Sequence, residues 1–371
     1  MNRSRLTIAL LLVMTFFLAA CSTQKTETKT DVESKEETVM TTEFAKPEEL
    51  TLTQEWDKVF PKNDKVDHQK VTFVNRYGIT LAADMYTPKD AEGKLPAIAV
   101  SGPFGAVKEQ SAGLYAQEMA ARGFLAIAFD PSFTGESGGM PRRVASPDIN
   151  TEDFSAAVDF LSVQDNVDPD RIGIIGICGW GGIALNAAAS DTRIKATVGS
   201  TMYDMTRIGA KGYFDANDSA EERQAMREAF SAQRTEDYKN GFYTRAGGVV
   251  DPLPDDAPYF VKDYYDYYKT ERGYHERSGN STDGWNTTSN IPFMNFKFLE
   301  YADEIQNAVM ILHGEKAHSR YMGEDAFKKL KGDNKELVIV PGASHTDLYD
   351  GGDNNYIPFD KLQNFFETYL A

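Results

Sequence analysis

The sequence predicts a doubly wound α/β protein built on a mostly parallel sheet of about eight strands. Short runs of consecutive apolar residues, with the length of buried parallel strands, recur between residues 97 and 340. Amphipathic helical patterns separate most of these runs. A pair of alternating runs precedes them and is typical of an antiparallel hairpin at one end of the sheet.

The elements follow one another in a regular order. Residues 71–75 alternate, Arg76-Tyr77-Gly78 marks a turn, and residues 79–86 alternate again, which predicts the hairpin. The predicted buried strands are residues 97–100, 125–129, 172–175, 196–199, 309–312 and 337–340. The predicted crossover helices are residues 114–122, 151–164, 181–190, 324–331 and 360–369.

One interval interrupts this order, because residues 204–303 contain no convincing buried strand. We interpret it as a helical cap inserted in the domain. Ser219-Ala-Glu-Glu222 has the form of a capping box that opens a helix, and a second helix is expected over residues 257–272. Several tyrosines of that second helix either line a substrate cleft or only pack the cap onto the body.

The N-terminus predicts export. Arg3 and Arg5 precede an apolar stretch that ends at Leu18-Ala-Ala-Cys21, which resembles the bacterial lipobox. Residues 1–20 are thus a predicted lipoprotein signal peptide, Cys21 the lipidated residue, residues 21–50 a disordered tether and residues 51–371 the folded domain. The protein is expected in the bacterial cell envelope, facing outside the cytoplasm and touching membrane only through its lipid anchor. The alternative is an ordinary cleaved signal with an unmodified Cys21.

Composition narrows the class of function. The net charge of −17, from 56 acidic and 39 basic residues, argues against nucleic-acid binding. Two cysteines and five scattered histidines form no metal-ligand spacing, and no phosphate-binding loop is present, so we expect neither metal nor cofactor. If Cys21 carries lipid, Cys178 is an unpaired thiol in an oxidising compartment.

Cys178 is the candidate nucleophile. It follows the predicted strand at residues 172–175 and precedes a small-residue helix, in the run Gly176-Ile-Cys178-Gly-Trp-Gly-Gly182. A strand-to-helix turn of this kind exposes a reactive side chain and places backbone amides beside it. The alternative is a buried, inert cysteine.

Four motifs together resemble the α/β-hydrolase superfamily, and the cysteine makes the chain similar to its dienelactone hydrolase-like members. They are Gly176-Ile-Cys178, the loop from Asp130 to Gly138, His313-Gly-Glu315 and Gly342-Ala-Ser-His345. The resemblance covers the chain from about residue 71 except the insertion. It implies an α/β-hydrolase fold and a cofactor-free hydrolase that uses a Cys-His-acid triad through a thioester acyl-enzyme.

The family pattern assigns the base and the acid by position. His345 follows the last predicted strand, as the catalytic histidine does, with His318 as its rival. The acid is expected where this chain has Ala317, so Glu315 is our candidate, and Asp204 is the alternative.

The two expected oxyanion donors are the backbone amides of Gly179 and Phe104, since Pro103 has no N–H. Trp180 stands where the family usually has glycine. Ser137, in the string Gly135-Glu-Ser-Gly-Gly139, lacks the strand-to-helix context of a nucleophile. These features predict a hydrolase of small-molecule carboxylic esters, lactones or related acyl bonds, and leave open a non-catalytic binding lipoprotein of the same fold. The oligomeric state is not predicted.

Overall fold

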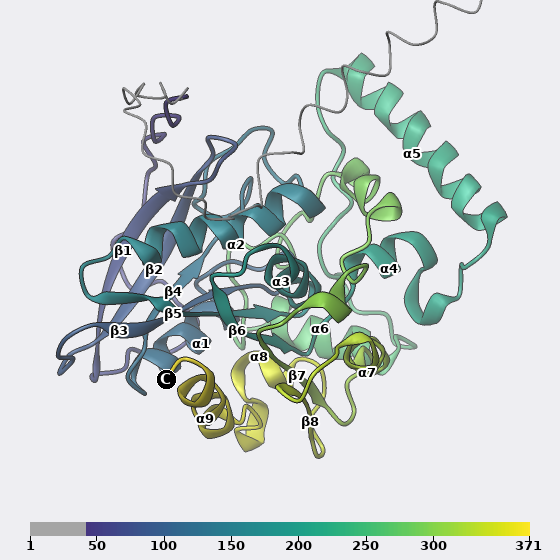
Figure 1. The fold of residues 1–371 in the computed structure, drawn as a ribbon. Coiled ribbons are helices and arrows are strands. Elements are labelled where there is room, and N and C mark those ends of the chain that lie inside the picture. The colour runs from purple at the N-terminus through teal and green to yellow at the C-terminus, as the bar shows by residue number, and fades with distance from the viewer. Residues whose placement is uncertain (1–41) are drawn as a thin grey trace, which may run out of the picture. The chain divides into compact units, whose positions relative to one another are not determined.

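The computed structural model describes residues 42–371, which contain one eight-stranded sheet (Figure 1). The strand order is β1-β2-β4-β3-β5-β6-β7-β8. The first two strands are antiparallel to their neighbours, whereas β4, β3 and β5 to β8 run parallel. The strands are β1 (Val66–Val74), β2 (Thr80–Pro88), β3 (Leu95–Ser101), β4 (Leu125–Phe129), β5 (Val167–Ile177), β6 (Ile194–Ser200), β7 (Ala308–Gly314) and β8 (Lys335–Val340).

Helices cover both faces of the sheet, each over its own apolar layer (Figure 1). Alternate residues of a strand face opposite sides, so Ile98 and Val100 of β3 pack beneath α1 and α9. Ala97 and Ala99 of the same strand pack beneath α2 and α3. The helices are α1 (Ser111–Ala120), α2 (Pro147–Ser162), α3 (Gly179–Ser190), α4 (Met205–Lys211), α5 (Ala220–Asn240), α6 (Tyr259–Lys269), α7 (Arg320–Lys329), α8 (Asp347–Asp350) and α9 (Phe359–Tyr369).

The predicted doubly wound α/β architecture is confirmed, including the hairpin and all six parallel strands, although β8, at the sheet edge, is only half-buried. The elements differ from the prediction mainly at their ends. Helix α3 begins at Gly179, two residues earlier than expected, so it starts directly after Cys178. That start is not apparent from apolar periodicity because the first turn consists of glycines and a tryptophan.

The chain between β6 and β7, residues 201–307, is here called the β6–β7 segment. It holds α4, α5, α6 and short 3-10 turns, and its β-structure is limited to two isolated bridges. The Ser219 side chain accepts a hydrogen bond from the Glu222 amide and caps α5, as the capping box predicts. Helix α5 projects from the rest of this segment in Figure 1.

The predictions for the signal peptide, for Cys21 and for most of the tether lie outside the described residues. Residues 42–50 have no regular secondary structure, but the Glu48 amide already bonds to Thr80 Oγ1 at 2.7 Å. Within residues 42–371, no helix is both long and apolar enough to cross a membrane.

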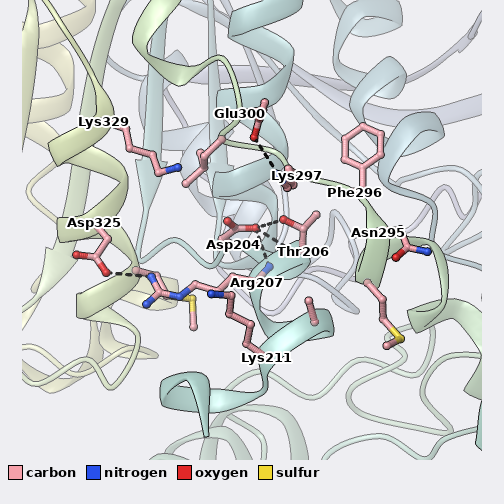
Figure 2. A pocket seen from close by; sticks show the side chains of 14 residues that line it. Asp204, Thr206, Arg207, Lys211, Asn295, Phe296, Lys297, Glu300, Asp325 and Lys329 are labelled. Carbon is pink, nitrogen blue, oxygen red and sulfur yellow. Dashed lines mark hydrogen bonds and ion pairs between the residues drawn. The ribbon is translucent and has the colours of Figure 1, made fainter. Parts of the chain in front are cut away.

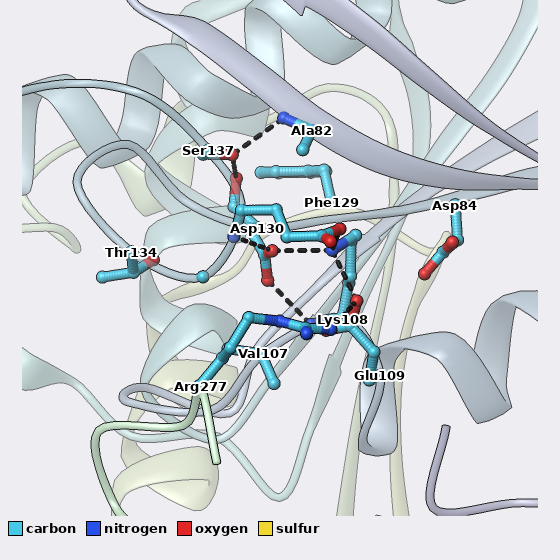
Figure 3. A network of polar contacts seen from close by, with 12 residues as sticks. Ala82, Asp84, Val107, Lys108, Glu109, Phe129, Asp130, Thr134, Ser137 and Arg277 are labelled. Carbon is cyan, nitrogen blue, oxygen red and sulfur yellow. Dashed lines mark hydrogen bonds and ion pairs between the residues drawn. The ribbon is translucent and has the colours of Figure 1, made fainter. Parts of the chain in front are cut away.

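A buried ionic network lies beside the loop that follows β3 (Figure 3). The Lys108 ammonium is 2.6 Å from Glu109, 2.9 Å from Asp130 and 2.6 Å from Glu136, and its side chain is wholly buried. Burial lowers the pKa of Lys108, but the neighbouring carboxylates outweigh this and raise it well above its ordinary value. The Lys108 amide also donates to Asp130, so the network fixes the β3 loop to the end of β4.

Replacing the central cation should destabilise the protein strongly. In Lys108→Met, three carboxylates lose their common partner inside the protein, and we expect the free energy of unfolding to fall by about 3–5 kcal/mol. Urea unfolding at pH 7 measures this. The control is Lys239→Met, which removes a cation from an exposed pair with Glu236 and should leave stability nearly unchanged. Equal stability of Lys108→Met and the wild type would contradict the assigned role.

Candidate active site

Cys178 lies in the sharp turn that joins β5 to α3. Its φ is +58° and its ψ is −125°, a conformation that residues other than glycine seldom adopt. The Cys178 amide donates to the Ser200 carbonyl at 2.9 Å, and its carbonyl accepts from the Tyr203 amide at 2.8 Å. A Cβ atom at Gly176 would lie 2.1 Å from the Trp180 carbonyl oxygen, so glycine is required there. Backbone bonding and close packing together hold the strained turn.

Two backbone amides, those of Gly179 and Phe104, face the Cys178 sulfur. Burial raises the pKa of the thiol to about 11, although the nearby Tyr349 hydroxyl and these two amides act in the opposite direction. The thiol is therefore protonated at neutral pH. The structure brings both amides that were expected to form the oxyanion hole beside the candidate nucleophile.

The β6–β7 segment holds the loop that carries the Phe104 amide. Asn280 Nδ2 donates to the Phe104 carbonyl at 2.8 Å, and the Asn280 amide donates to the Gly105 carbonyl at 3.1 Å. Ser278 Oγ donates to the same Gly105 carbonyl at 3.0 Å. Gly105 has a φ of +86°, and a Cβ there would collide with the Asn280 side chain. The donor loop is thus fixed from one side by this segment and from the other by the Lys108 network.

His345 lies in the loop after β8 and is wholly buried. Its Nδ1 is 2.9 Å from Thr201 Oγ1 and 2.7 Å from Ser319 Oγ. Its Nε2 is 3.0 Å from the Tyr349 hydroxyl. Burial lowers the pKa of His345 well below its ordinary value, and the nearby His318 lowers it further. The imidazole is therefore neutral at pH 7.

Tyr349 belongs to α8 and lies four residues beyond His345, which precedes that helix. Its ring is fully buried, with its centroid 5.2 Å from that of His345. The hydroxyl that meets His345 Nε2 also faces the Cys178 thiol. The role of Tyr349 is not apparent from the motifs of the sequence, and its only signal is its place four residues after His345.

Neither expected acid contacts His345, and this corrects the predicted triad. Glu315 is exposed and accepts a hydrogen bond from the Gly342 amide at 2.8 Å. Asp204 caps α4 instead, because its carboxylate accepts from the Thr206 and Arg207 amides. Both carboxylates thus accept hydrogen bonds from nearby backbone amides instead of from His345.

Two hydroxyls occupy the position of the missing acid. Within residues 42–371, the hydrogen-bond partners of His345 are the hydroxyls of Thr201, Ser319 and Tyr349. Thr201 directly follows β6, and Ser319 lies in the loop after β7. Both therefore lie at the carboxyl ends of neighbouring parallel strands, where α/β proteins usually place their sites.

His318, the rival base, is near His345 but is bound elsewhere. The two ring centroids are 5.0 Å apart, and His318 Nε2 forms a hydrogen bond with the Tyr203 hydroxyl. Burial lowers the pKa of His318 to about 4. His345 is the histidine that is hydrogen-bonded to Tyr349, and Tyr349 lines the cavity together with Cys178.

Cys178 opens into a cavity of about 230 Å³. Aromatic and small residues form its wall, and none of the lining residues carries a formal charge at pH 7. The remaining lining residues are Phe104, Tyr203, Met205, Ile208, Tyr213, Gly247, Gly248, Val249, Tyr264, Tyr268, Asn280 and Tyr349. Of the tyrosines expected along α6, Tyr264 and Tyr268 reach this cavity, while Tyr267 packs behind it against Tyr349.

Trp180 does not narrow this cavity. Its side chain is buried beneath the turn, with ring centroids 5.7 Å from Phe129 and 5.3 Å from Phe154. The string around Ser137 is structural, because the Ser137 hydroxyl donates to the Asp130 carbonyl and accepts from the Ala82 amide. Figure 3 places Ser137 above the Lys108 network.

A larger cavity, of about 550 Å³, lies on the other side of α4 (Figure 2). Asp204, Arg207 and Lys211 line it, whereas Met205 and Ile208 of the same helix line the Cys178 cavity. Among the described residues, the carboxylates of Glu109, Asp130 and Glu136 have metal-ligand spacing. The Lys108 ammonium contacts all three, so these carboxylates already have a cation.

Comparison with known proteins agrees with this architecture. The family model described as X-Pro dipeptidyl-peptidase (S15 family) matches residues 77–347. The uncharacterized protein PA2218 of Pseudomonas aeruginosa is 57% identical over 324 residues, which are 87% of this chain and 86% of that protein. Its crystal structure superposes with a TM-score of 0.84, covering 87% of this chain and 99% of the other.

One further relative has a named activity, and one further solved structure shares the fold. Thiohydrolase aneE of Aspergillus aculeatus is 33% identical over 136 residues, 37% of this chain and 42% of that protein. The α/β hydrolase GrgF of a Penicillium species shares the fold, with a TM-score of 0.68 and 19% identity over 82% of this chain and 99% of its own. The chain therefore belongs to the S15 family described by the X-Pro dipeptidyl-peptidase model, and thus to the α/β-hydrolase superfamily.

Proposed function

We propose that this protein hydrolyses uncharged carboxylic esters, lactones or thioesters, with Cys178 as the nucleophile. The observation that carries the proposal is the Cys178 turn itself. A sulfur at the start of α3, faced by the amides of Gly179 and Phe104, has the arrangement required for attack on a carbonyl and for stabilising the oxyanion that results.

The reaction divides into two acyl transfers. The thiol proton passes to His345, the sulfur attacks the carbonyl carbon, and the amides of Gly179 and Phe104 bind the oxyanion. Collapse breaks the bond to the leaving group, which takes the proton from His345, and leaves a thioester on Cys178. Water then attacks the thioester with His345 again accepting a proton, the carboxylic acid is released and the thiol is restored.

The cavity supports an uncharged substrate. An enzyme that removes dipeptides from a peptide N-terminus must hold a free ammonium group, and a buried cation requires a counter-charge. None of the residues lining the Cys178 cavity is acidic. The tyrosine and asparagine groups there suit carbonyl and hydroxyl groups on an apolar acyl chain. The relation to thiohydrolase aneE supports acyl-sulfur bonds as part of this range.

One observation favours a second candidate, a non-catalytic binding protein of the same fold. His345 is oriented by hydroxyls rather than by a carboxylate, so an imidazolium formed there receives less electrostatic stabilisation than in a Cys-His-acid triad. In either case we propose a lipid-anchored protein of the bacterial envelope, on the strength of the sequence around Cys21.

Cys178→Ala should abolish turnover. We expect the kcat/KM for p-nitrophenyl esters, δ-lactones and acyl thioesters to fall at least about 10³-fold, because the covalent route is lost. Ser137→Ala is the matched control, since it removes the serine of the other Gly-x-nucleophile-x-Gly string and should keep its activity. If no substrate in this panel is turned over in a manner that requires Cys178, the binding protein is the better description.

The substrate class can be tested with two chromogenic substrates, an uncharged ester and a dipeptide anilide that carries a free ammonium group. We expect hydrolysis of p-nitrophenyl butyrate and no release of p-nitroaniline from Gly-Pro-p-nitroanilide, because the cavity offers no counter-charge for the peptide ammonium. Absorbance at 405 nm follows both reactions. Cleavage of the dipeptide substrate would contradict the assigned specificity.

The pH profile should be broad. A base whose pKa is lowered stays neutral and active below pH 6.5, and a thiol with a pKa of about 11 stays protonated until the solution is strongly alkaline. We therefore expect kcat/KM to be flat from pH 6.5 to pH 9, with its acid limb below pH 6.5. Thiolate absorbance near 240 nm at pH 7, or an acid limb above pH 7, would show that a thiolate-imidazolium pair exists instead.

A further inference from the structure

The Tyr349 hydroxyl stands between the two groups that must exchange a proton. It lies 3.0 Å from His345 Nε2 and faces the Cys178 thiol. In the structure of residues 42–371, no hydrogen bond joins Cys178 directly to His345. The Tyr349 hydroxyl is hydrogen-bonded to His345 and lines the same cavity as Cys178, so it offers a route from thiol to imidazole through a phenol.

We propose that Tyr349 is a catalytic residue that relays the proton between the Cys178 sulfur and His345 Nε2. This inference rests on the proposed hydrolase function. The proposal places Tyr349 between the nucleophile and the base, where a Cys-His-acid triad has no residue.

The direction of each hydrogen bond follows from the partners. For Nε2 to accept a proton, the neutral His345 must carry its hydrogen on Nδ1, and the hydroxyl oxygens of Thr201 and Ser319 can both accept from it. The Tyr349 hydroxyl then donates to Nε2, and its oxygen is free to accept from the thiol. The chain runs from the sulfur through the phenol and the imidazole to the two hydroxyls.

The proton balance is complete without another reactant. As the sulfur attacks, its proton passes to the Tyr349 oxygen while the Tyr349 proton passes to His345 Nε2. Tyrosine is neutral before and after, and the net result is one proton moved from sulfur to imidazole. Protonation of the leaving group reverses the path, with the His345 proton delivered through the same hydroxyl.

The surroundings suit a relay that never becomes charged. Tyr349 is fully buried, and burial raises the pKa of its phenol, so a separate phenolate is disfavoured. Packing fixes the ring, with the Tyr267 centroid at 5.0 Å. The Tyr115 hydroxyl donates to the Leu348 carbonyl at 2.7 Å, which holds the backbone beside Tyr349 in place. A fixed hydroxyl can pass protons without reorganisation.

The decisive variant is Tyr349→Phe, which keeps the ring and removes only the hydroxyl. We expect kcat/KM for the best ester and the rate of Cys178 alkylation by iodoacetamide at pH 7.5 each to fall about 10²-fold. The matched control is Tyr267→Phe, whose buried hydroxyl has no hydrogen-bond partner among residues 42–371 and lies outside the cavity lining. It should match the wild type in both assays, and thermal unfolding of both variants checks that each is folded.

A second measurement separates a relay from a structural role. In mixtures of H₂O and D₂O, the wild-type kcat/KM should show the curved dependence on deuterium fraction that two protons in motion produce. Loss of ring packing alone would not create this curvature. For the residual activity of Tyr349→Phe, kcat/KM should vary linearly with the deuterium fraction of the solvent.

The possible results distinguish the relay from the hydrolase function. A linear wild-type dependence, or a Tyr349→Phe variant equal to the wild type in turnover and alkylation, would overturn the relay and leave Cys178 hydrolysis intact. If no acyl substrate is turned over, the proposed function fails, and alkylation still tests the relay because it requires only removal of the thiol proton. Slower alkylation in Tyr349→Phe alone would then support it.

Discussion

The site depends on one backbone constraint, the strained conformation of Cys178 between β5 and α3, with φ at +58° and ψ at −125°. A residue other than glycine in such a sparsely populated region costs about 1–3 kcal/mol, and the surrounding structure must supply that energy. Backbone bonds to Ser200 and Tyr203, and the absence of a side chain at Gly176, meet this requirement. The strained turn gives the sulfur its place above the sheet and brings the Gly179 amide next to it. The Cys178 sulfur is therefore the reference position of the site. Each of the other groups, namely His345, Tyr349 and the Phe104 loop, is placed by its distance and direction from that sulfur.

Most of the fold was predictable because the sheet is buried on both faces. Strands such as β4 read as short uninterrupted apolar runs, and the helices between them show clear periodicity. The position of Cys178 was predictable for the same reason, since it ends one of these runs. The Gly179 and Phe104 amides were expected from the oxyanion-hole positions of the family that the chain resembles and from the missing N–H of Pro103.

The partners of His345 were not predictable in the same way. Its position after β8 depended on strand order, but its hydrogen bonds depend on loop conformations that leave no periodic pattern. Glu315 had the expected residue type and nearly the expected position, yet it turns outward to the Gly342 amide. Serine and threonine hydroxyls carry no distinctive sequence signal. Tyr349 was obscured among many buried tyrosines, because its role comes from the hydroxyl position rather than from the ring.

The bonding of Asn280 to the Phe104 loop has a consequence for how this protein can diverge. A segment inserted between two strands is commonly treated as a module that sets substrate choice while the core keeps its chemistry. Here the β6–β7 segment also holds the Phe104 loop, whose amide is the proposed oxyanion donor. Under the proposed mechanism, changes within this segment alter transition-state binding together with cavity shape, so specificity and catalytic power would not evolve independently.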